Sequence, residues 1–221
     1  MSPPGREIRG APYEGVAMAL TVCLWRHPRP EQATGRCIGR RTDLRVDPRR
    51  AKRLAHRVRA QARRDDGPRE VWTSSLRRAA DVGRWLARWG WAHRIDDRLA
   101  ELDFGQWDGR SWDDIGAEQV DAWCRDFAGH PPGGGEAVAA LMVRCAVWLG
   151  DRRQGGGRVY LVGHAGWINA ARLLQERSVG DAPPASLQPS DWPPALAYGA
   201  ALQLVFTGCA PISACSALAS Q

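Results

Sequence analysis

The sequence has no apolar run long enough to span a bilayer, and residues 1–14 lack the hydrophobic core of a signal peptide. Its six cysteines form no CxxC pair and no cluster with ligand-like spacing, which disfavours a zinc site. Lysine is almost missing, since Lys52 is the single lysine among 31 basic residues. We therefore expect a cytoplasmic protein with reduced thiols, no bound metal and no membrane partner.

The length of 221 residues and a hydrophobic content of 44% suit one large domain with its own core. We expect this domain to cover residues 16–206, with a loose extension over residues 1–15 and a flexible tail over residues 207–221. Met18 directly precedes the first apolar segment, so translation could begin at Met1 or at Met18. The sequence leaves that choice open.

The positive charge is concentrated in one region. The net charge is +7, and residues 26–64 hold 14 basic and 3 acidic residues, a local excess of 11. Nucleic acid is the first partner that such a patch suggests. However, Asp47 and Pro48 are typical of a helix start, and the helix after them has an apolar face opposite its arginines. We therefore expect a solvated helix face and no nucleic-acid partner.

Strands and helices alternate along the chain. Apolar runs predict strands at residues 16–25, 70–73, 92–95, 159–162 and 198–206. Helical periodicity predicts helices at residues 48–64, between Ser75 and Gly90, and at residues 111–127, 136–149 and 167–174. This order predicts an α/β fold, a three-layer sandwich with a mostly parallel, doubly wound central sheet and helices on both faces.

Polar residues come directly after three of the predicted strands, at the point where each strand ends. Arg26 and His27 follow the first strand, the segment 74–78 follows the second, and His164 follows the strand at 159–162. Parallel strands have their carboxyl ends on one side of a sheet, where ligands of open α/β folds bind. We therefore expect these side chains to meet in one pocket.

With these motifs in order, the chain resembles the histidine phosphatase superfamily, the phosphoglycerate-mutase-like proteins. The matching segments are Arg26-His27-Pro28, Ser74 to Ala79, Leu99 to Gly109, Pro132 to Glu136, and Gly163 to Gly166. Two positions depart from the family pattern: Pro28 replaces the usual glycine, and Ala33 replaces an asparagine that contacts phosphate in many members. Arg29, Arg36 and Arg40 are candidates to supply the missing phosphate contacts.

The resemblance implies hydrolysis of a phosphomonoester through a phosphohistidine on His27. Arg26 and Arg78 would bind the phosphate oxygens, because a planar guanidinium matches their geometry. His164, if protonated, would add positive charge, and Glu101 would protonate the leaving alkoxide. This chemistry requires no metal and no cofactor.

Several alternatives remain open at this point. Phosphoglycerate mutase-type transfer is one, and a non-catalytic basic protein that binds nucleic acid or regulates a partner is another. Chain length and the Gly133 to Glu136 segment favour the α-ribazole phosphatase branch of cobalamin biosynthesis, with α-ribazole 5′-phosphate as substrate. The oligomeric state cannot be read from the sequence. Four tryptophans near the motifs could line the pocket, although each alone is expected in the core: Trp25, Trp107, Trp112 and Trp167.

Overall fold

The computed structural model describes residues 19–176 and 187–207. The predicted extension at 1–15, and the predicted tail apart from Thr207, lie outside these residues. The described chain forms a five-stranded sheet in the order β3-β2-β4-β1-β5. The strands are β1 (Leu20–Arg26), β2 (Glu70–Thr73), β3 (Ala92–Ile95), β4 (Gly157–Gly163) and β5 (Ala201–Phe206). Neighbouring strands are parallel except β5, which runs antiparallel to β1 at one edge.

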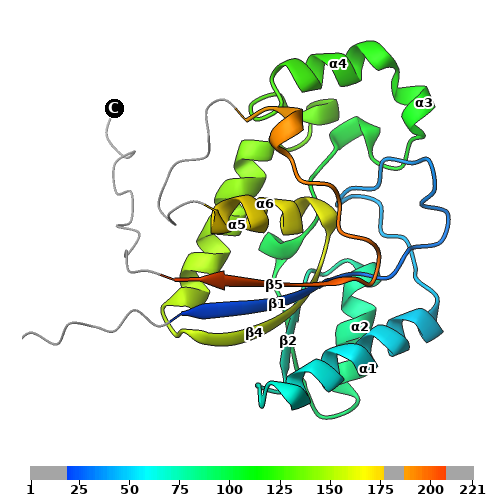
Figure 1. Cartoon of the computed structure of the whole chain (residues 1–221). Coiled ribbons are helices and arrows are strands. Elements are labelled where there is room, and N and C mark those ends of the chain that lie inside the picture. Colours follow the sequence, from blue (N-terminus) through cyan, green and yellow to red (C-terminus); the bar gives the residue numbers. More distant parts are fainter. Residues whose placement is uncertain (1–18, 177–186, 208–221) are drawn as a thin grey trace, which may run out of the picture.

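Helices cover both faces of this sheet (Figure 1). Helices α1 (Pro48–Arg64) and α2 (Arg77–Ala87) pack together on one face. Helices α5 (Val138–Arg153) and α6 (Ala165–Gln175) pack together on the other. The predicted three-layer α/β sandwich with a mostly parallel sheet is confirmed.

The burial pattern of β1 shows why residues 22–25 of this strand are all apolar. Leu20, Val22 and Leu24 belong to the core beneath α5 and α6, whereas Cys23 and Trp25 belong to the core beneath α1 and α2. Successive side chains of a strand point to opposite faces, so a strand covered on both faces has no solvent-facing positions. Strand β1 is therefore an interior strand, and the residues directly after it lie beside the carboxyl end of the middle strand, β4.

Helix α1 begins as its sequence predicts. The Asp47 side chain accepts a hydrogen bond from the Arg49 backbone N–H, and Pro48 occupies the first helical position. Its apolar residues are buried against the sheet: Ala51, Leu54, Ala55, Val58 and Ala62.

The structure divides one predicted helix in two and shifts the bounds of other predicted elements. The helix predicted at 111–127 is two helices, α3 (Trp112–Ile115) and α4 (Ala117–Arg125). Gly116 separates them with a φ of +84°, a left-handed conformation that glycine adopts without steric cost. Helix α5 covers 138–153 instead of 136–149, and β5 begins at residue 201 instead of 198.

Helices α3 and α4 form a small cap at one end of the molecule, next to the segment that leads into β5 (Figure 1). Among the described residues, no helix is both long and apolar enough to cross a membrane.

Candidate active site

The predicted site residues converge at the carboxyl ends of three adjacent strands. His27 follows β1, His164 follows β4, and the segment 74–78 follows β2, and these strands are neighbours in the order β2-β4-β1. The His27 backbone N–H donates to the Gly163 carbonyl, which extends the β1–β4 pairing by one residue. The two imidazole rings are 5.0 Å apart between centroids. The expected convergence is therefore present.

One nitrogen of His27 is fixed by the backbone. Nδ1 is 2.8 Å from the Pro28 carbonyl oxygen. A carbonyl can only accept, so Nδ1 carries the proton and the neutral ring presents a lone pair on Nε2. Burial holds the pKa of His27 well below its ordinary value of 6.5, and the charges of Arg78 and Arg26 lower it further. The imidazole is thus neutral, with its lone pair on Nε2.

His164 has the opposite tautomer. The Arg78 Nε–H donates to His164 Nδ1 at 3.3 Å, so Nδ1 holds a lone pair. The proton therefore lies on Nε2, which is 2.7 Å from the Ser74 hydroxyl. Burial places the pKa of His164 well below 6.5, and the positive charges of Arg78, Arg144 and Arg26 lower it further. The resemblance implied that His164 adds positive charge if its ring is protonated. These contacts leave the ring neutral.

Arg78 is buried in the first turn of α2 and connects that helix to the loop at 39–42. Its two terminal nitrogens donate to the carbonyl oxygens of Gly39 and Thr42, both at 2.8 Å. Burial lowers the pKa of Arg78 from its ordinary value, against the opposing charge of Glu101. Arginine nevertheless remains charged in proteins, so Arg78 supplies permanent positive charge beside His164.

Arg26 is held by Tyr198, a residue that the sequence analysis did not assign to the site. The Arg26 guanidinium carbon lies 3.8 Å from the centre of the Tyr198 ring, and an Arg26 terminal nitrogen donates to the Leu196 carbonyl at 2.7 Å. The same ring is 5.5 Å from the ring of His27. Tyr198 therefore orients both the cation and the imidazole at the end of β1.

Glu101 is buried, and one of its oxygens is already occupied. Oε1 accepts hydrogen bonds from the backbone N–H groups of Leu102 (3.0 Å) and Gly166 (2.9 Å). Oε2 has no hydrogen-bond partner among the described residues, so it is the oxygen free to exchange a proton. A side chain at position 166 would place its Cβ 2.3 Å from Oε1, which explains the glycine there.

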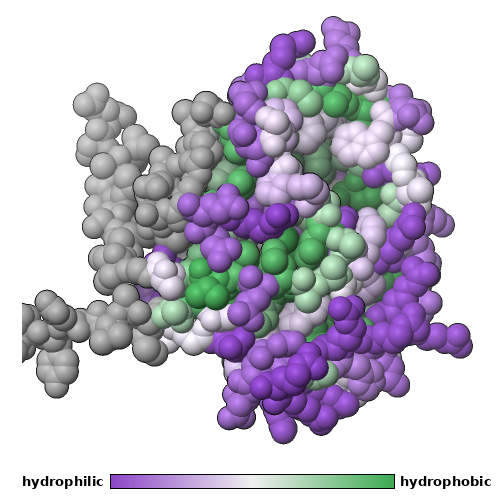
Figure 2. Space-filling view, viewed as in Figure 1, coloured by the Kyte–Doolittle hydropathy of each residue, from purple (hydrophilic) through white to green (hydrophobic). Residues whose placement is uncertain are grey.

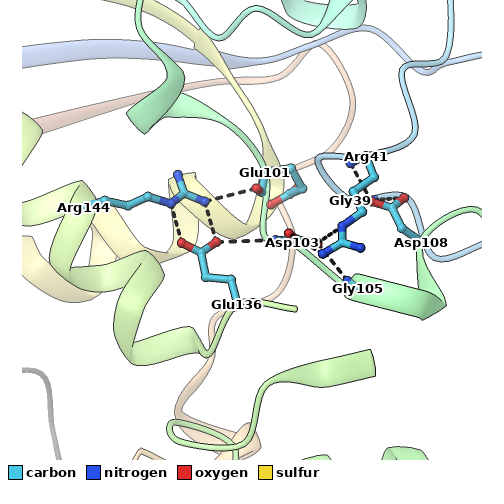
Figure 3. Close-up of polar contacts among 8 residues, drawn as sticks. All are labelled: Gly39, Arg41, Glu101, Asp103, Gly105, Asp108, Glu136 and Arg144. Atoms are coloured by element: carbon cyan, nitrogen blue, oxygen red, sulfur yellow. Dashed lines mark hydrogen bonds and ion pairs between the residues drawn. The ribbon is translucent and has the colours of Figure 1, made fainter. Parts of the chain in front are cut away.

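The loop that carries Glu101 is held by an ion pair (Figure 3). Arg144 pairs with both oxygens of Glu136, at 2.7 and 2.9 Å, and each side chain is only 14% exposed. Arg144 also donates to the backbone carbonyls of Arg98, Ala100 and Glu101. Arg144 of α5, held by the final glutamate of the 132–136 motif, thus positions the Glu101 loop.

Two further carboxylates join this loop to the basic loop at 36–42 (Figure 3). Asp108 accepts from the backbone N–H groups of Gly39 and Arg41, and Asp103 forms a two-point ion pair with the Arg41 side chain. Because the Gly39 carbonyl binds Arg78, these contacts also fix the Arg78 guanidinium. Asp103 and Asp108 therefore hold the loop that positions Arg78.

The three additional arginine candidates differ in position. Arg36 lines a cavity together with Ala33, Arg26 and Glu101. Arg29 is exposed and donates to the Thr34 hydroxyl, and the side chain of Arg40 is also exposed. The structure thus brings Arg36 beside the predicted site residues. A phosphate contact by any of the three remains a prediction.

Of the four tryptophans near the motifs, three are in the core and one lines the cavity. Trp25, Trp107 and Trp167 are at most 3% exposed, whereas Trp112 lies on the cavity wall. Within the described ranges, no three His, Cys, Asp or Glu side chains are placed to hold a metal ion.

Two imidazoles and two guanidinium groups at the carboxyl ends of parallel strands define an anion site on an α/β sheet. The sequence establishes the family: the model of the Histidine phosphatase superfamily (branch 1) matches residues 22–184. The chain belongs to this superfamily.

Solved structures agree with this assignment. The native structure of a mycobacterial glucosyl-3-phosphoglycerate phosphatase superposes with a TM-score of 0.67 and 25% identity, covering 85% of this chain and 90% of that one. The complex of the same enzyme with inorganic phosphate gives a TM-score of 0.59 and 26% identity, covering 74% and 81%. A Thermus thermophilus protein shares the fold, with a TM-score of 0.57 and 24% identity over 83% and 92% of the two chains. A search of curated proteins gave no match.

Proposed function

We propose that the protein is a phosphomonoester hydrolase that acts through a phosphohistidine on His27. The observation that carries this proposal is the Nδ1–H bond from His27 to Pro28, which leaves the lone pair of a neutral imidazole on Nε2 in the field of Arg78 and Arg26. Membership of the superfamily and the similarity to a phosphatase support it. Arginine charge suits a phosphate dianion because it persists at every working pH.

The reaction has two displacements. His27 Nε2 attacks phosphorus, the P–O bond to the alcohol breaks, and the departing alkoxide takes a proton from Glu101 Oε2. Water then attacks the phosphohistidine, and Glu101 accepts its proton as the P–N bond breaks. Inorganic phosphate leaves, and both His27 and Glu101 return to their starting states.

His164 takes part through charge. Its contact with Arg78 keeps it neutral in the described geometry. A phosphate dianion beside the ring would favour the protonated form, against burial and the arginines. We propose that His164 stabilises the equatorial oxygens in that form, together with Arg78.

The substrate is a small phosphate ester, handled in the cytoplasm. Cys23, Cys37 and Cys145 are buried free thiols, which supports a reducing compartment. Chain length and the Gly133 to Glu136 segment favour α-ribazole 5′-phosphate, and the similarity to the mycobacterial enzyme adds glucosyl-3-phosphoglycerate. Both belong in an assay panel, with a phosphoglycerate to test mutase-type transfer.

The test combines an assay with trapping of the intermediate. His27→Ala should lower kcat/KM at least about a thousandfold, and His56→Ala should not, because His56 is exposed on α1. Rapid quenching without acid should trap phosphate on His27, as located by peptide mapping. Phosphate on another residue, or turnover by His27→Ala near that of the unmodified protein, would refute the assignment.

A further inference from the structure

A cavity of about 310 Å³ opens beside Glu101 and Arg26. It lies between the Glu101 loop, the α3–α4 cap and the segment before β5, and Figure 2 shows hydrophobic residues gathered below that cap. Glu101 would protonate the leaving oxygen, so a cavity at Glu101 is where the alcohol side of the ester would extend. The side chains that line this cavity would therefore decide which leaving alcohols fit.

Aromatic side chains form one continuous part of the cavity wall. Besides Tyr198, five aromatic rings line it and contact one another in an unbroken series, with centroid distances from 5.1 to 6.2 Å. The series runs from the cap to the segment before β5: Trp112, Phe104, Trp123, Phe127 and Trp192. Val138 and Leu141 of α5 extend this apolar surface.

The charged, amide and hydroxyl side chains on the cavity wall are few: Arg26, Arg36, Glu101, Asn169 and Tyr198. Arg26 and Glu101 face the predicted phosphate end, and Arg36 donates to the Gly109 carbonyl. Asn169 uses its amide nitrogen on the Pro193 carbonyl, and its Oδ1 has no partner among the described residues. A polyhydroxylated group here would leave most of its hydroxyls without partners, which costs binding free energy at each one.

We propose that this cavity binds the leaving alcohol through an apolar ring, so that the preferred substrate is the phosphate ester of an alcohol with such a ring. The inference rests on the proposed phosphatase function. A cavity of roughly 150 Å³ holds benzene, so this one has room for two fused rings. Sugar phosphates and glycerol phosphate are then poor substrates.

The test compares esters with similar leaving oxygens. 2-Phenylethyl phosphate and 2-(indol-3-yl)ethyl phosphate carry apolar rings, whereas glycerol 3-phosphate and glucose 6-phosphate do not, and all four release primary alcohols. We expect kcat/KM to be roughly 10- to 100-fold higher for the two ring esters. Equal values for all four esters would refute the cavity inference while leaving the phosphatase function intact.

Trp112→Ala tests the wall directly, because Trp112 is 40% exposed and its loss should spare the fold. We expect a roughly tenfold lower kcat/KM for the ring esters and little change for glycerol 3-phosphate. Trp89→Ala is the matched control, since Trp89 is a partly buried tryptophan packed on His56 far from the cavity wall. A loss shared by all esters, or by both variants, would contradict the proposal.

Failure of the phosphatase proposal would be visible separately. If no ester is hydrolysed, calorimetric titration with 2-(indol-3-yl)ethanol still measures whether the cavity binds such an alcohol. Binding that Trp112→Ala weakens roughly tenfold would support the cavity inference alone. Absence of binding in the intact protein would overturn it.

Discussion

Two histidines at the same site are neutral for different reasons. His27 has its proton fixed by a carbonyl acceptor, and His164 has its lone pair fixed by a guanidinium donor. His27 thus presents a free nitrogen to the substrate side, whereas both nitrogens of His164 have partners. These contacts favour His27, and not His164, as the nucleophile of the proposed reaction.

The position of Glu101 makes a kinetic prediction. Glu101→Gln keeps an oxygen for the Leu102 and Gly166 donors but cannot supply the proton. We expect kcat/KM for 2-phenylethyl phosphate to fall about 10²–10⁴-fold, and that for p-nitrophenyl phosphate, whose leaving group needs no proton, far less. Because kcat/KM excludes dephosphorylation, the comparison isolates leaving-group protonation. Equal losses on both esters would make Glu101 a structural carboxylate.

The buried histidines also predict acid destabilisation. Each has a folded-state pKa well below 6.5, so below that pH the unfolded chain binds more protons than the folded one. The free energy of unfolding therefore falls as the pH drops through 6.5 towards the folded pKa. Between pH 7.0 and 5.5 each buried histidine should contribute a loss of about 1 kcal/mol.

Urea unfolding at the two pH values, in buffer without phosphate, measures this loss. His27→Gln should lose less stability on acidification than the unmodified protein. The difference should equal the loss in unfolding free energy that one buried histidine contributes. His56→Gln should show the full loss, because it replaces an exposed histidine and leaves both buried histidines in place. An identical pH dependence in all three proteins would mean that His27 titrates normally.

The sequence predicted the residues that converge at the strand ends but few of those that hold them in place. His27, Arg78 and His164 each lie in a short motif after a buried strand, and all three converge. Tyr198 is 171 positions from His27 in the sequence (198 − 27) and becomes its neighbour only because β5 pairs with β1. Ser74 lay within a matched motif, yet its bond to His164 depends on the β2–β4 pairing.

At the scale of elements, periodicity located the strands and helices, and local backbone geometry set their ends. The 111–127 segment has a helical apolar pattern throughout, yet Gly116 breaks it. The break matters because α3 then presents Trp112 to the cavity while α4 presents Trp123. Apolar spacing alone could not show this, since both helices retain apolar positions.

The Glu136–Arg144 pair makes a prediction about the loop between β3 and α3. Glu136→Gln removes a charged, two-point contact, and we expect a loss of about 1–3 kcal/mol in the free energy of unfolding. Since Arg144 also binds the Glu101 carbonyl, displacement of Glu101 should slow 2-phenylethyl phosphate more than p-nitrophenyl phosphate. Urea unfolding and kcat/KM on both esters measure the two effects.

Asp81→Asn is the matched control for this pair. It breaks an ion pair with Arg84 whose arginine is 54% exposed, so its effect should stay within about 0.5 kcal/mol. If Glu136→Gln changed both esters equally, the pair would stabilise the fold without positioning Glu101.

Over the whole molecule, the excess of positive charge divides between the site and a helix surface. Helix α1 buries its apolar face and exposes its arginines, as its periodicity predicted. Arg57 is an exception with a structural contact, because it donates to the Gly199 carbonyl at 2.7 Å, next to Tyr198. A test of the basic surface should therefore leave Arg57 in place.

The exposed arginines of α1 should have no specific partner. Replacing Arg49, Arg50 and Arg53 together by Gln should change kcat/KM only modestly, through a salt-sensitive loss of steering for an anionic substrate. A nucleic-acid-binding protein would instead bind duplex or single strands with a steep salt dependence, and this triple variant would lose that binding. A gel-shift titration at two salt concentrations separates the two cases. Tight binding near physiological salt that disappears in the variant would make nucleic acid the partner of this face.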